Sequence, residues 1–380
     1  MESFFKKKLV FAILFCAILL GFSFYTAGQY YGFFTDINFK GKALTAYGHM
    51  EKILGKRESK NLSYVKDKEG YIYYSAAYIQ PDKNVLNYAT RVRRLKEFEE
   101  KKGAKCMVVS FPQKNWKKTE AGIGLPIANY NYLQDEFLFN LMYGRVDSLD
   151  LRIAFDKLQA DETKLYYKTD SSLTSYGSFM AFSALLQEME NRYGINPDQD
   201  GYYRNARNYK IIEYKNSFLG NLGDDAGLGF ANLEDFQLYI LQDQKKYVWE
   251  RLSKENSKYT IEGTGAQTLL DMGVLKAENV YDSDFMDVFM NSDDALDVVK
   301  NADNKQGLKI LCIRDENFAP IGVLLAPLCS ELHMISANTS LVDIEDYVAE
   351  HDFDLVLVGI SARNIKEEFF KYGETKESFK

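Results

Sequence analysis

Short apolar runs that alternate with helical segments constrain the fold of this chain more than any other feature. Runs that are apolar on both sides of the backbone are typical of strands buried in a parallel sheet. They occupy Cys106–Phe111, Leu308–Ile313, Leu332–Ser336 and Leu355–Gly359. Helices are predicted at Asn84–Lys101, Asn131–Tyr143, Thr174–Arg192, Ala319–Leu328 and Ile344–Glu350. This alternation predicts an α/β fold in which helices cover both faces of a mostly parallel sheet.

An apolar segment near the N-terminus predicts a membrane anchor. No charged residue occurs between Lys8 and Asp36, and three lysines precede this run. About 20 apolar residues span a bilayer as a helix, and flanking lysines stay on the cytoplasmic side. A cleaved signal peptide is the alternative, but bulky Tyr25 stands where cleavage needs a small residue. We therefore expect an uncleaved, single-pass anchor in the cell membrane at residues 9–27.

The anchor divides the rest of the chain. Residues 1–8 are expected to form a cytoplasmic tail, and everything after residue 27 to lie outside the cytoplasm. Residues 28–70 are mixed and charged, which suggests a stalk or peripheral segment. Residues 71–365 carry the α/β pattern, with further short strands expected at Tyr71–Ala77, Leu165–Lys168 and Phe236–Leu241. Residues 366–380 are expected to be a polar tail.

Composition and motifs exclude several classes of function. The net charge of -7 argues against a nucleic-acid partner, which requires a basic face. The four cysteines form no Cys-Xaa-Xaa-Cys motif and no cluster with histidine, so we predict no metal site. The glycine-rich stretch at 220–229 lacks the Lys-Ser/Thr ending of a phosphate-binding loop. No cofactor is predicted.

Two polar segments stand where ligands bind in open α/β sheets, beyond the carboxyl ends of strands. The first is Tyr166–Gly177, which contains Asp170, and the second is Leu311–Pro320, which contains Glu316. An acidic pair at such a place is suited to acid/base work on glycosidic bonds. The alternative is structural, because each carboxylate has a basic neighbour in the chain and Glu316 precedes a predicted helix.

Together the two segments resemble the SGNH-hydrolase-like proteins of the DHHW and alginate O-acetyltransferase type. In that family the first segment reads Tyr-Xaa-Lys/Arg-Thr-Asp-Xaa-His-Trp-Thr-Xaa-Xaa-Gly-Ala, and the second reads Lys-Asp-Ser-Tyr-Ala. Val109–Lys114 is similar to the family's Val-Pro-Xaa-Lys strand end, and Asn216–Leu222 to its Phe-Xaa-Gly-Thr-Leu stretch. The resemblance covers roughly residues 70–365. It implies a three-layer, flavodoxin-like fold with a mostly parallel sheet.

The resemblance also places the family's catalytic triad, and here the sequence departs from it. Asp170 matches the family aspartate, but Ser172 stands at the histidine position and Glu316 at the position of the nucleophilic serine. A serine nucleophile is weak unless an imidazole takes its proton and a carboxylate orients that imidazole. The chain has only three histidines, and all lie outside both segments: His49, His333 and His351. The departures predict a degenerate site.

Further polar residues beside these positions are candidates for substrate binding. They are Lys114, Ser171, Arg314 and Asn317. The adjacent hydroxyls of Ser171 and Ser172 allow two interpretations. They are either a rearranged nucleophile or a polar turn in which serine and threonine cap the following helix.

The resemblance implies a role in acetylation of a secreted or cell-wall polysaccharide, alongside a multi-spanning membrane acyltransferase. We expect a degenerate member to bind the glycan or the partner instead of transferring acetyl groups. An active O-acetyltransferase or acetylesterase with a non-standard nucleophile is the first alternative. A structural subunit of an envelope assembly with no glycan site is the second.

Overall fold

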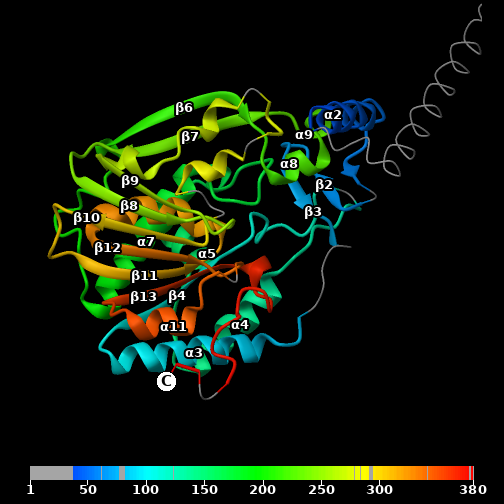
Figure 1. Ribbon diagram of the computed structural model, residues 1–380. Helices are drawn as coiled ribbons and strands as arrows, with labels where there is room; N and C mark the ends of the chain where they lie inside the picture. Colours follow the sequence, from blue (N-terminus) through cyan, green and yellow to red (C-terminus); the bar gives the residue numbers. More distant parts are fainter. Residues whose placement is uncertain are drawn as a thin grey trace, which may run out of the picture.

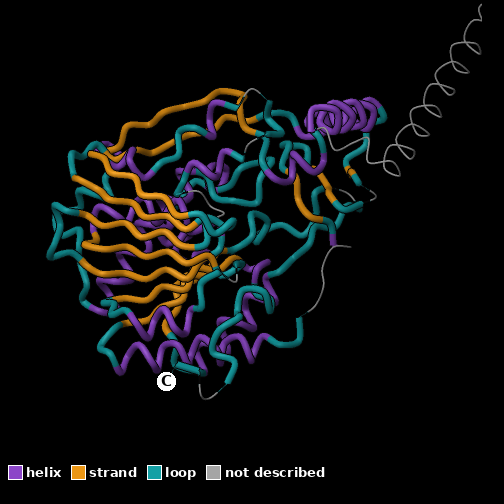
Figure 2. The backbone as a smooth tube through the Cα atoms, viewed as in Figure 1, coloured by secondary structure: helices purple, strands orange, loops and turns teal. Residues whose placement is uncertain are grey.

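The computed structural model describes residues 37–380 apart from residues 61, 77–81, 123, 278, 283, 291–293, 340, 376–377 and 380. Its centre is an eight-stranded sheet in the order β5-β4-β13-β11-β12-β10-β8-β9 (Figures 1 and 2). In that order the strands are Asp147–Asp150, Lys105–Phe111, Leu355–Ser361, Leu308–Arg314, Cys329–Ser336, Leu296–Asn301, Lys246–Leu252 and Lys258–Thr264.

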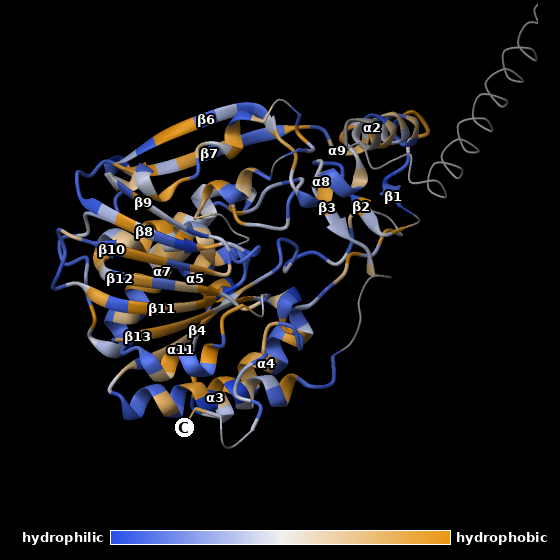
Figure 3. Cartoon of the chain, viewed as in Figure 1, coloured by the Kyte–Doolittle hydropathy of each residue, from blue (hydrophilic) through white to orange (hydrophobic). Residues whose placement is uncertain are grey.

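The sheet is mixed, which corrects the expectation of a mostly parallel one. The five strands from β5 to β12 are parallel, whereas β10, β8 and β9 extend the sheet by antiparallel pairing. The parallel part is buried on both faces. In β13, for example, Leu355 and Leu357 face one core cluster and Val356 and Val358 face the other. This explains why its sequence is continuously apolar (Figure 3).

Helices cover both faces of the sheet, so the fold has three layers. One layer packs on the alternate side chains of β4, β11 and β13. It comprises α3 (Val85–Lys101), α4 (Asn131–Tyr143) and α11 (Ile344–Glu350). The opposite layer comprises α5 (Leu151–Lys157), α7 (Ser175–Tyr193), α10 (Ala319–Leu325) and the hairpin of β6 (Tyr209–Phe218) with β7 (Glu234–Leu241). The helices predicted from apolar spacing are thus confirmed, with small shifts at their ends.

The N-terminal part of the described chain forms a layer of its own at one corner of the molecule (Figure 1). It comprises α2 (Ile37–Ile53), β1 (Glu58–Ser59), β2 (Tyr64–Lys66) and β3 (Ile72–Tyr74), and it packs on α8 (Asn221–Ala226) and α9 (Leu228–Ala231). The backbones of α2 and α9 nearly touch. A Cβ atom added to Gly48 would lie 2.4 Å from the Phe230 amide nitrogen. From Ile37 onward, the segment expected as a stalk or peripheral layer is therefore a packed layer.

The C-terminal segment differs from the polar tail that its charges suggested. Phe369 and Phe370 are fully buried, and Phe370 stacks on Tyr88 of α3 at 4.8 Å between ring centres. These aromatic residues complete the core under α3 and α4. The charged residues on either side of them, Lys366, Glu367, Glu368 and Lys371, are exposed, which makes the segment look polar in the sequence.

The predicted anchor at residues 9–27 lies outside the described residues. Within residues 37–380, as described, no helix is long and apolar enough to cross a bilayer.

Candidate functional site

Three neighbouring parallel strands end at one edge of the sheet. In the register of these strands, Phe111 at the end of β4 is opposite Ser361 at the end of β13, and Arg314 of β11 is opposite Gly359. The loops that follow them carry Lys114 after β4, Asp315–Asn317 after β11, and Ser361–Asn364 after β13. The edge therefore gathers polar residues from distant parts of the chain, as expected for a ligand site in this class of fold.

The loop from Tyr166 to Thr174 joins these strand ends, although not as the predicted strand. Residues expected as a strand at Leu165–Lys168 instead end a short helix, α6 (Glu162–Leu165), and continue as a loop. Thr174 caps α7 as predicted, with its hydroxyl accepting from the Gly177 amide at 3.0 Å. The Leu173 amide donates to the Asn317 Oδ1 atom at 3.1 Å. The two segments chosen from the sequence are therefore in direct contact.

Asp170 is buried and fixed by two backbone amides. Its Oδ1 atom accepts from the Ser172 amide at 2.8 Å, and its Oδ2 atom accepts from the Asn221 amide at 2.6 Å. Gly220 makes this possible, because a Cβ atom there would lie 2.3 Å from the Asp170 Cβ. The Asn221 side chain also donates to the Ser171 hydroxyl at 2.9 Å. This aspartate thus orders the loop around it.

The other two triad positions lie on either side of Asn317. Ser172 is 2% exposed and lies in the loop that Asp170 holds. Glu316 begins a single 3-10 turn after β11, and its Oε2 atom accepts from the Asn364 side chain at 3.3 Å. Glu316 therefore brings a carboxylate to this edge of the sheet.

Asp315, beside Glu316, was not singled out from the sequence, yet it lies at the centre of the strand ends. It is fully buried and accepts from the Ser361 amide at 2.6 Å and from the Asn364 side chain at 3.0 Å. Burial, and then the neighbouring Glu316 carboxylate, raise the pKa of Asp315 to about 7. It ties the end of β11 to the end of β13.

Arg363 was also missed by sequence reasoning. Its guanidinium lies over the Tyr74 ring at 4.6 Å. Burial disfavours its charge, but Tyr74 and the Glu316 carboxylate outweigh burial and raise the pKa of Arg363. The available signal was its position directly after the strand that ends at Ser361. Arg363 therefore brings a positive charge close to Glu316 at the strand ends.

Lys114 lies at the site but is committed to the backbone. Its Nζ atom donates to the carbonyl oxygens of Lys168 at 2.9 Å and Asp170 at 2.8 Å, with a longer contact to Tyr167 at 3.4 Å. Burial lowers the pKa of Lys114 to about 7, although nearby Glu234 opposes the shift. These hydrogen bonds hold the loop that contains Lys168 and Asp170. Because the Nζ atom is used by the backbone, the predicted role of Lys114 in substrate binding is weaker.

Arg314, also predicted to bind substrate, lies inside the protein. It is fully buried, and its Nη2 atom lies 3.3 Å from the Oδ2 atom of Asp297 on β10. Burial raises the pKa of Asp297 to about 7, and the Arg314 charge opposes this shift. In this conformation the side chain is not accessible to a ligand. The predicted role therefore does not hold for Arg314, whose polarity is explained by a buried ion pair.

None of the three histidines compensates for Ser172. His333 contacts Glu331 and Tyr347 in the middle of the sheet, where burial lowers its pKa to about 4. His351 contacts the Tyr347 carbonyl, and His49 lies on α2. Across the described parts of the chain, no imidazole contacts the residues at the triad positions.

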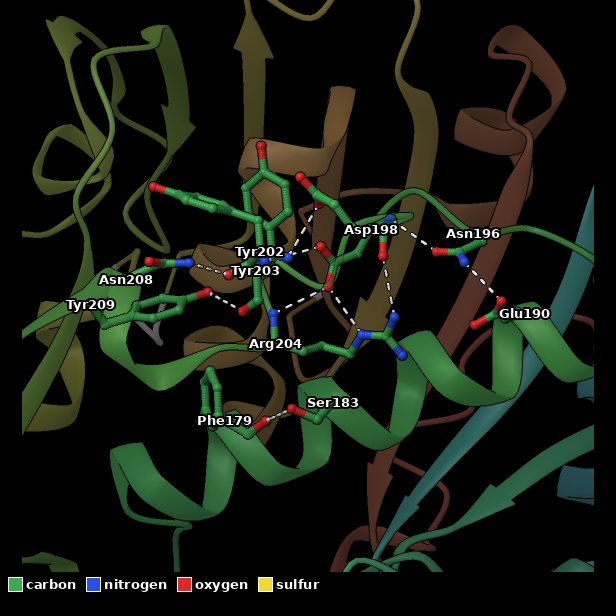
Figure 4. Close-up of polar contacts among 11 residues, drawn as sticks. Phe179, Ser183, Glu190, Asn196, Asp198, Tyr202, Tyr203, Arg204, Asn208 and Tyr209 are labelled. Carbon is green, nitrogen blue, oxygen red and sulfur yellow. Dashed lines mark hydrogen bonds and ion pairs between the residues drawn. The ribbon is translucent and has the colours of Figure 1, made fainter.

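A second buried polar cluster lies in the loop between α7 and β6 and is separate from this site (Figure 4). The Asp198 carboxylate accepts from the amide of Tyr203 at 3.0 Å and from the Arg204 Nε atom at 3.0 Å. Tyr209 donates to the Tyr203 carbonyl at 2.8 Å. The polar groups of this cluster are hydrogen-bonded to one another, and these bonds fix the conformation of the loop. Within residues 37–380, as described, no group of three or more His, Cys, Asp and Glu residues is suited to a metal ion.

The mixed sheet, its three layers and the polar residues at adjoining strand ends are those of an SGNH-like α/β fold. More specifically, residues 65–210 match the family model of the SGNH hydrolase-like domain of acetyltransferase AlgX. The resemblance inferred from the sequence motifs is thereby confirmed.

Solved structures show the same fold over most of the chain. One is Bacillus cereus PatB1 with a sulfonyl adduct, which is 14% identical, with a TM-score of 0.64, over 82% of this chain and 98% of that one. Another is a DHHW family protein from Eubacterium siraeum, which is 15% identical, with a TM-score of 0.58, over 82% and 93%. No curated protein matches the chain. At these identities the likeness establishes the fold.

Proposed function

We propose that this chain is a membrane-anchored, extracytoplasmic SGNH-like protein that assists acetylation of a secreted or cell-wall polysaccharide without transferring acetyl groups itself. The match to the acetyltransferase AlgX domain supports the connection with acetylation. The predicted span at residues 9–27 supports the location. The proposed partners are the polysaccharide and a multi-spanning membrane acyltransferase.

The observation that carries the loss of catalysis is the pair of residues at the triad positions. Acyl transfer by this type of triad needs a hydroxyl that attacks the acetyl carbonyl and an imidazole that takes its proton. Glu316 offers no hydroxyl, and the hydroxyl of Ser172 is a poor proton acceptor at neutral pH. Asp170, which would orient the imidazole, is instead occupied by two backbone amides.

The same residues are suited to binding. Near the strand ends, the Arg363 guanidinium lies over the Tyr74 ring, and the Ser171 hydroxyl accepts from the Asn221 side chain. Aromatic rings stack on apolar faces of sugars, whereas charged and hydroxyl groups bond to sugar oxygens or to carboxylates. A polysaccharide chain or a polar segment of the acyltransferase is the ligand that this surface would recognise.

Rebuilding the triad tests the proposal. We would compare wild type with Ser172→His, Glu316→Ser and the double variant, and measure acetate release from an activated acetyl ester. The expected result is an inactive wild type and single variants, with activity gained only in the double variant and lost again on adding Asp170→Asn. Unfolding midpoints of all variants check that His is accommodated at the buried position 172.

Acetylesterase activity of the wild-type chain that is lost in Asp170→Ala would contradict the proposal. In that case the active-enzyme alternative would take its place. One observation favours this alternative, namely the lowered pKa of Lys114, because a lysine that titrates near neutral pH can act as a base. An argument against this alternative is that the Lys114 ammonium donates hydrogen bonds to backbone carbonyls. Loss of a proton from Lys114 would remove a bond that holds the loop.

A fluorophosphonate probe separates the two functions directly. Labelling of the wild type that disappears in Ser171→Ala or Ser172→Ala would favour the enzyme. The matched control is Ser183→Ala on α7, where the hydroxyl donates to the Phe179 carbonyl at 2.9 Å, well away from the site. We expect no labelling above that of denatured protein in any of these variants.

A further inference from the structure

Helix α2 carries an apolar face that points away from the protein. Tyr47, Met50, Ile53 and, just past the helix end, Leu54 are 41%, 43%, 83% and 70% exposed. Residues 47, 50 and 54 are spaced by three and four, so they share one side of the helix. The opposite side, which includes Gly48, packs on α9. Large apolar side chains gathered on one exposed helix face usually mark an interaction surface.

Basic residues lie on α2 and directly after it, and one of them, Lys52, bonds to Asn232 beside α9 at 3.2 Å. Lys42, Lys52, Lys56 and Arg57 are all exposed. Two acidic residues lie in the same segment, namely Glu51, which is buried, and Glu58. Glu58 is paired with Lys56 at 3.4 Å. A local excess of positive charge is notable in a chain with a net charge of -7. An apolar helix face accompanied by Lys and Arg in the same segment is the chemistry that binds an anionic lipid surface.

The position of α2 in the chain selects the same partner. The predicted membrane span ends at Ala27, and α2 begins at Ile37. The intervening nine residues reach at most about 30 Å when fully extended. An anchored chain therefore holds α2 close to the headgroup layer at a high effective concentration.

We propose that the outer face of α2 lies on the anionic headgroup layer of the membrane, with Met50, Ile53 and Leu54 inserted and Lys42 and Arg57 at the phosphates. This inference rests on the proposed membrane anchor and deepens it. A second copy of the chain on the same face is the competing occupant. It is less favoured because two such surfaces would bring their positive charges together.

Docking of α2 would also set the position of the candidate site. Helix α2 packs on α9, and α9 follows α8, whose first residue Asn221 bonds to Asp170. The strand-end site is thus joined to the membrane-facing layer by packed structure.

The test measures the depth of a nitroxide label on the full chain in nanodiscs of phosphatidylglycerol and phosphatidylcholine. Labels are attached at Ile53→Cys and, as a control, at Leu86→Cys, which is 58% exposed on α3, away from α2 in Figure 1. Cys16 is replaced by Ala, and the other three cysteines are buried. We expect the label at 53 to be relaxed more by lipid-dissolved oxygen than by a water-soluble nickel chelate, and the label at 86 to show the reverse.

The outcomes separate the inference from the anchor. A chain that resists alkaline extraction from the membrane but has a water-exposed label at 53 keeps the anchor and overturns the inference. Spin–spin broadening between labels at 53, independent of lipid, would assign the face to a second copy and also overturn it.

If the chain does not insert into the membrane at all, the proposed anchor is wrong. Binding of the chain to lipid vesicles then tests whether α2 binds an anionic lipid surface. Salt-sensitive binding to phosphatidylglycerol vesicles should then weaken by about fivefold for each charge removed in Lys42→Gln and Arg57→Gln. Lys366→Gln and Lys371→Gln, two exposed lysines in the C-terminal segment, should leave it unchanged. Absence of binding by the wild type would overturn the inference together with the anchor.

Discussion

At the scale of single residues, the candidate site is held by backbone groups more than by side-chain pairs. Asp170 and Asp315 each accept hydrogen bonds from backbone amides, and Lys114 donates to carbonyl oxygens. Buried charges that are bonded in this way order the loops that carry them. The arrangement explains how the strand-end loops keep a defined shape.

Gly220 is the residue on which the position of Asp170 depends most directly. We expect Gly220→Ala to lower the free energy of unfolding by about 2 kcal/mol, because the new Cβ would overlap the Asp170 side chain. Urea unfolding followed by circular dichroism measures the change. Gly144→Ala is the matched control, since its nearest neighbouring atom would lie 3.3 Å away. Equal effects of the two substitutions would contradict the packing argument.

Glu99 of α3 predicts how stability depends on pH. It is fully buried, and neither side-chain oxygen has a hydrogen-bond partner among the described residues. Burial raises the pKa of Glu99 to about 7, above that of a carboxyl in the unfolded chain. The contribution of the protonated Glu99 side chain to the free energy of unfolding is therefore fully present at acidic pH. It is lost as the pH rises through 7.

Replacing this carboxyl should flatten that dependence. The free energy of unfolding of the wild type should fall between acidic and mildly alkaline pH. We expect this fall to be smaller by on the order of 2 kcal/mol in Glu99→Gln. Thermal unfolding across this pH range measures it. Glu97→Gln, on the exposed side of the same helix, should leave the pH profile as in wild type. An unchanged profile in Glu99→Gln would show that this carboxyl ionises normally.

At the scale of elements, the parallel strands create the site, and the segments that were hardest to interpret complete the core. The ends of β4, β11 and β13 meet because parallel strands carry their carboxyl ends to one edge. The aromatic residues after β13 then fold back and cover α3 and α4. The described residues from Lys366 to Glu374 thus belong to the structural domain.

Phe370 provides the test of that packing. We expect Phe370→Ala to cost about 3–5 kcal/mol of unfolding free energy, because the ring is fully buried between Tyr88 and Phe137. Chemical denaturation gives the value. Phe139→Ala, at a ring that is 61% exposed on α4, should change stability by less than about 0.5 kcal/mol. A small effect at 370 would mean that the C-terminal segment is not part of the core.

At the scale of the whole molecule, the proposed function depends on where the domain is held. An apolar span at the N-terminus and an exposed apolar, basic face on α2 would act together to keep the strand-end site close to the membrane. Such a placement suits a protein that presents polysaccharide to a membrane-embedded partner.

The anchor can be tested without disturbing the folded domain. We expect Leu14→Asp together with Leu19→Asp to move the chain from the membrane fraction to the aqueous fraction, because each charge at mid-span costs about 3 kcal/mol. Fractionation followed by alkaline extraction measures the distribution. Leu86→Asp on the surface of α3 is the control and should remain in the membrane. Retention of the doubly substituted chain would argue for attachment by another part of the protein.

The sequence alone determined the layered α/β class, most helices and the pairing of two polar segments. Apolar periodicity and strand-end polarity are local signals, and short motifs place them in order along the chain. The match of Ser172 and Glu316 to the family's histidine and serine positions rests on these short motifs and stays a prediction.

Only the tertiary structure decided which polar residues face the site and which face the core. Arg314 follows an apolar run much as Lys114 follows another, yet one is buried against Asp297 and the other supports a loop. Asp315 became central because Ser361 and Asn364 arrive from a strand far along the chain. Burial and partner choice are set by contacts between distant segments, and local patterns carry no record of them.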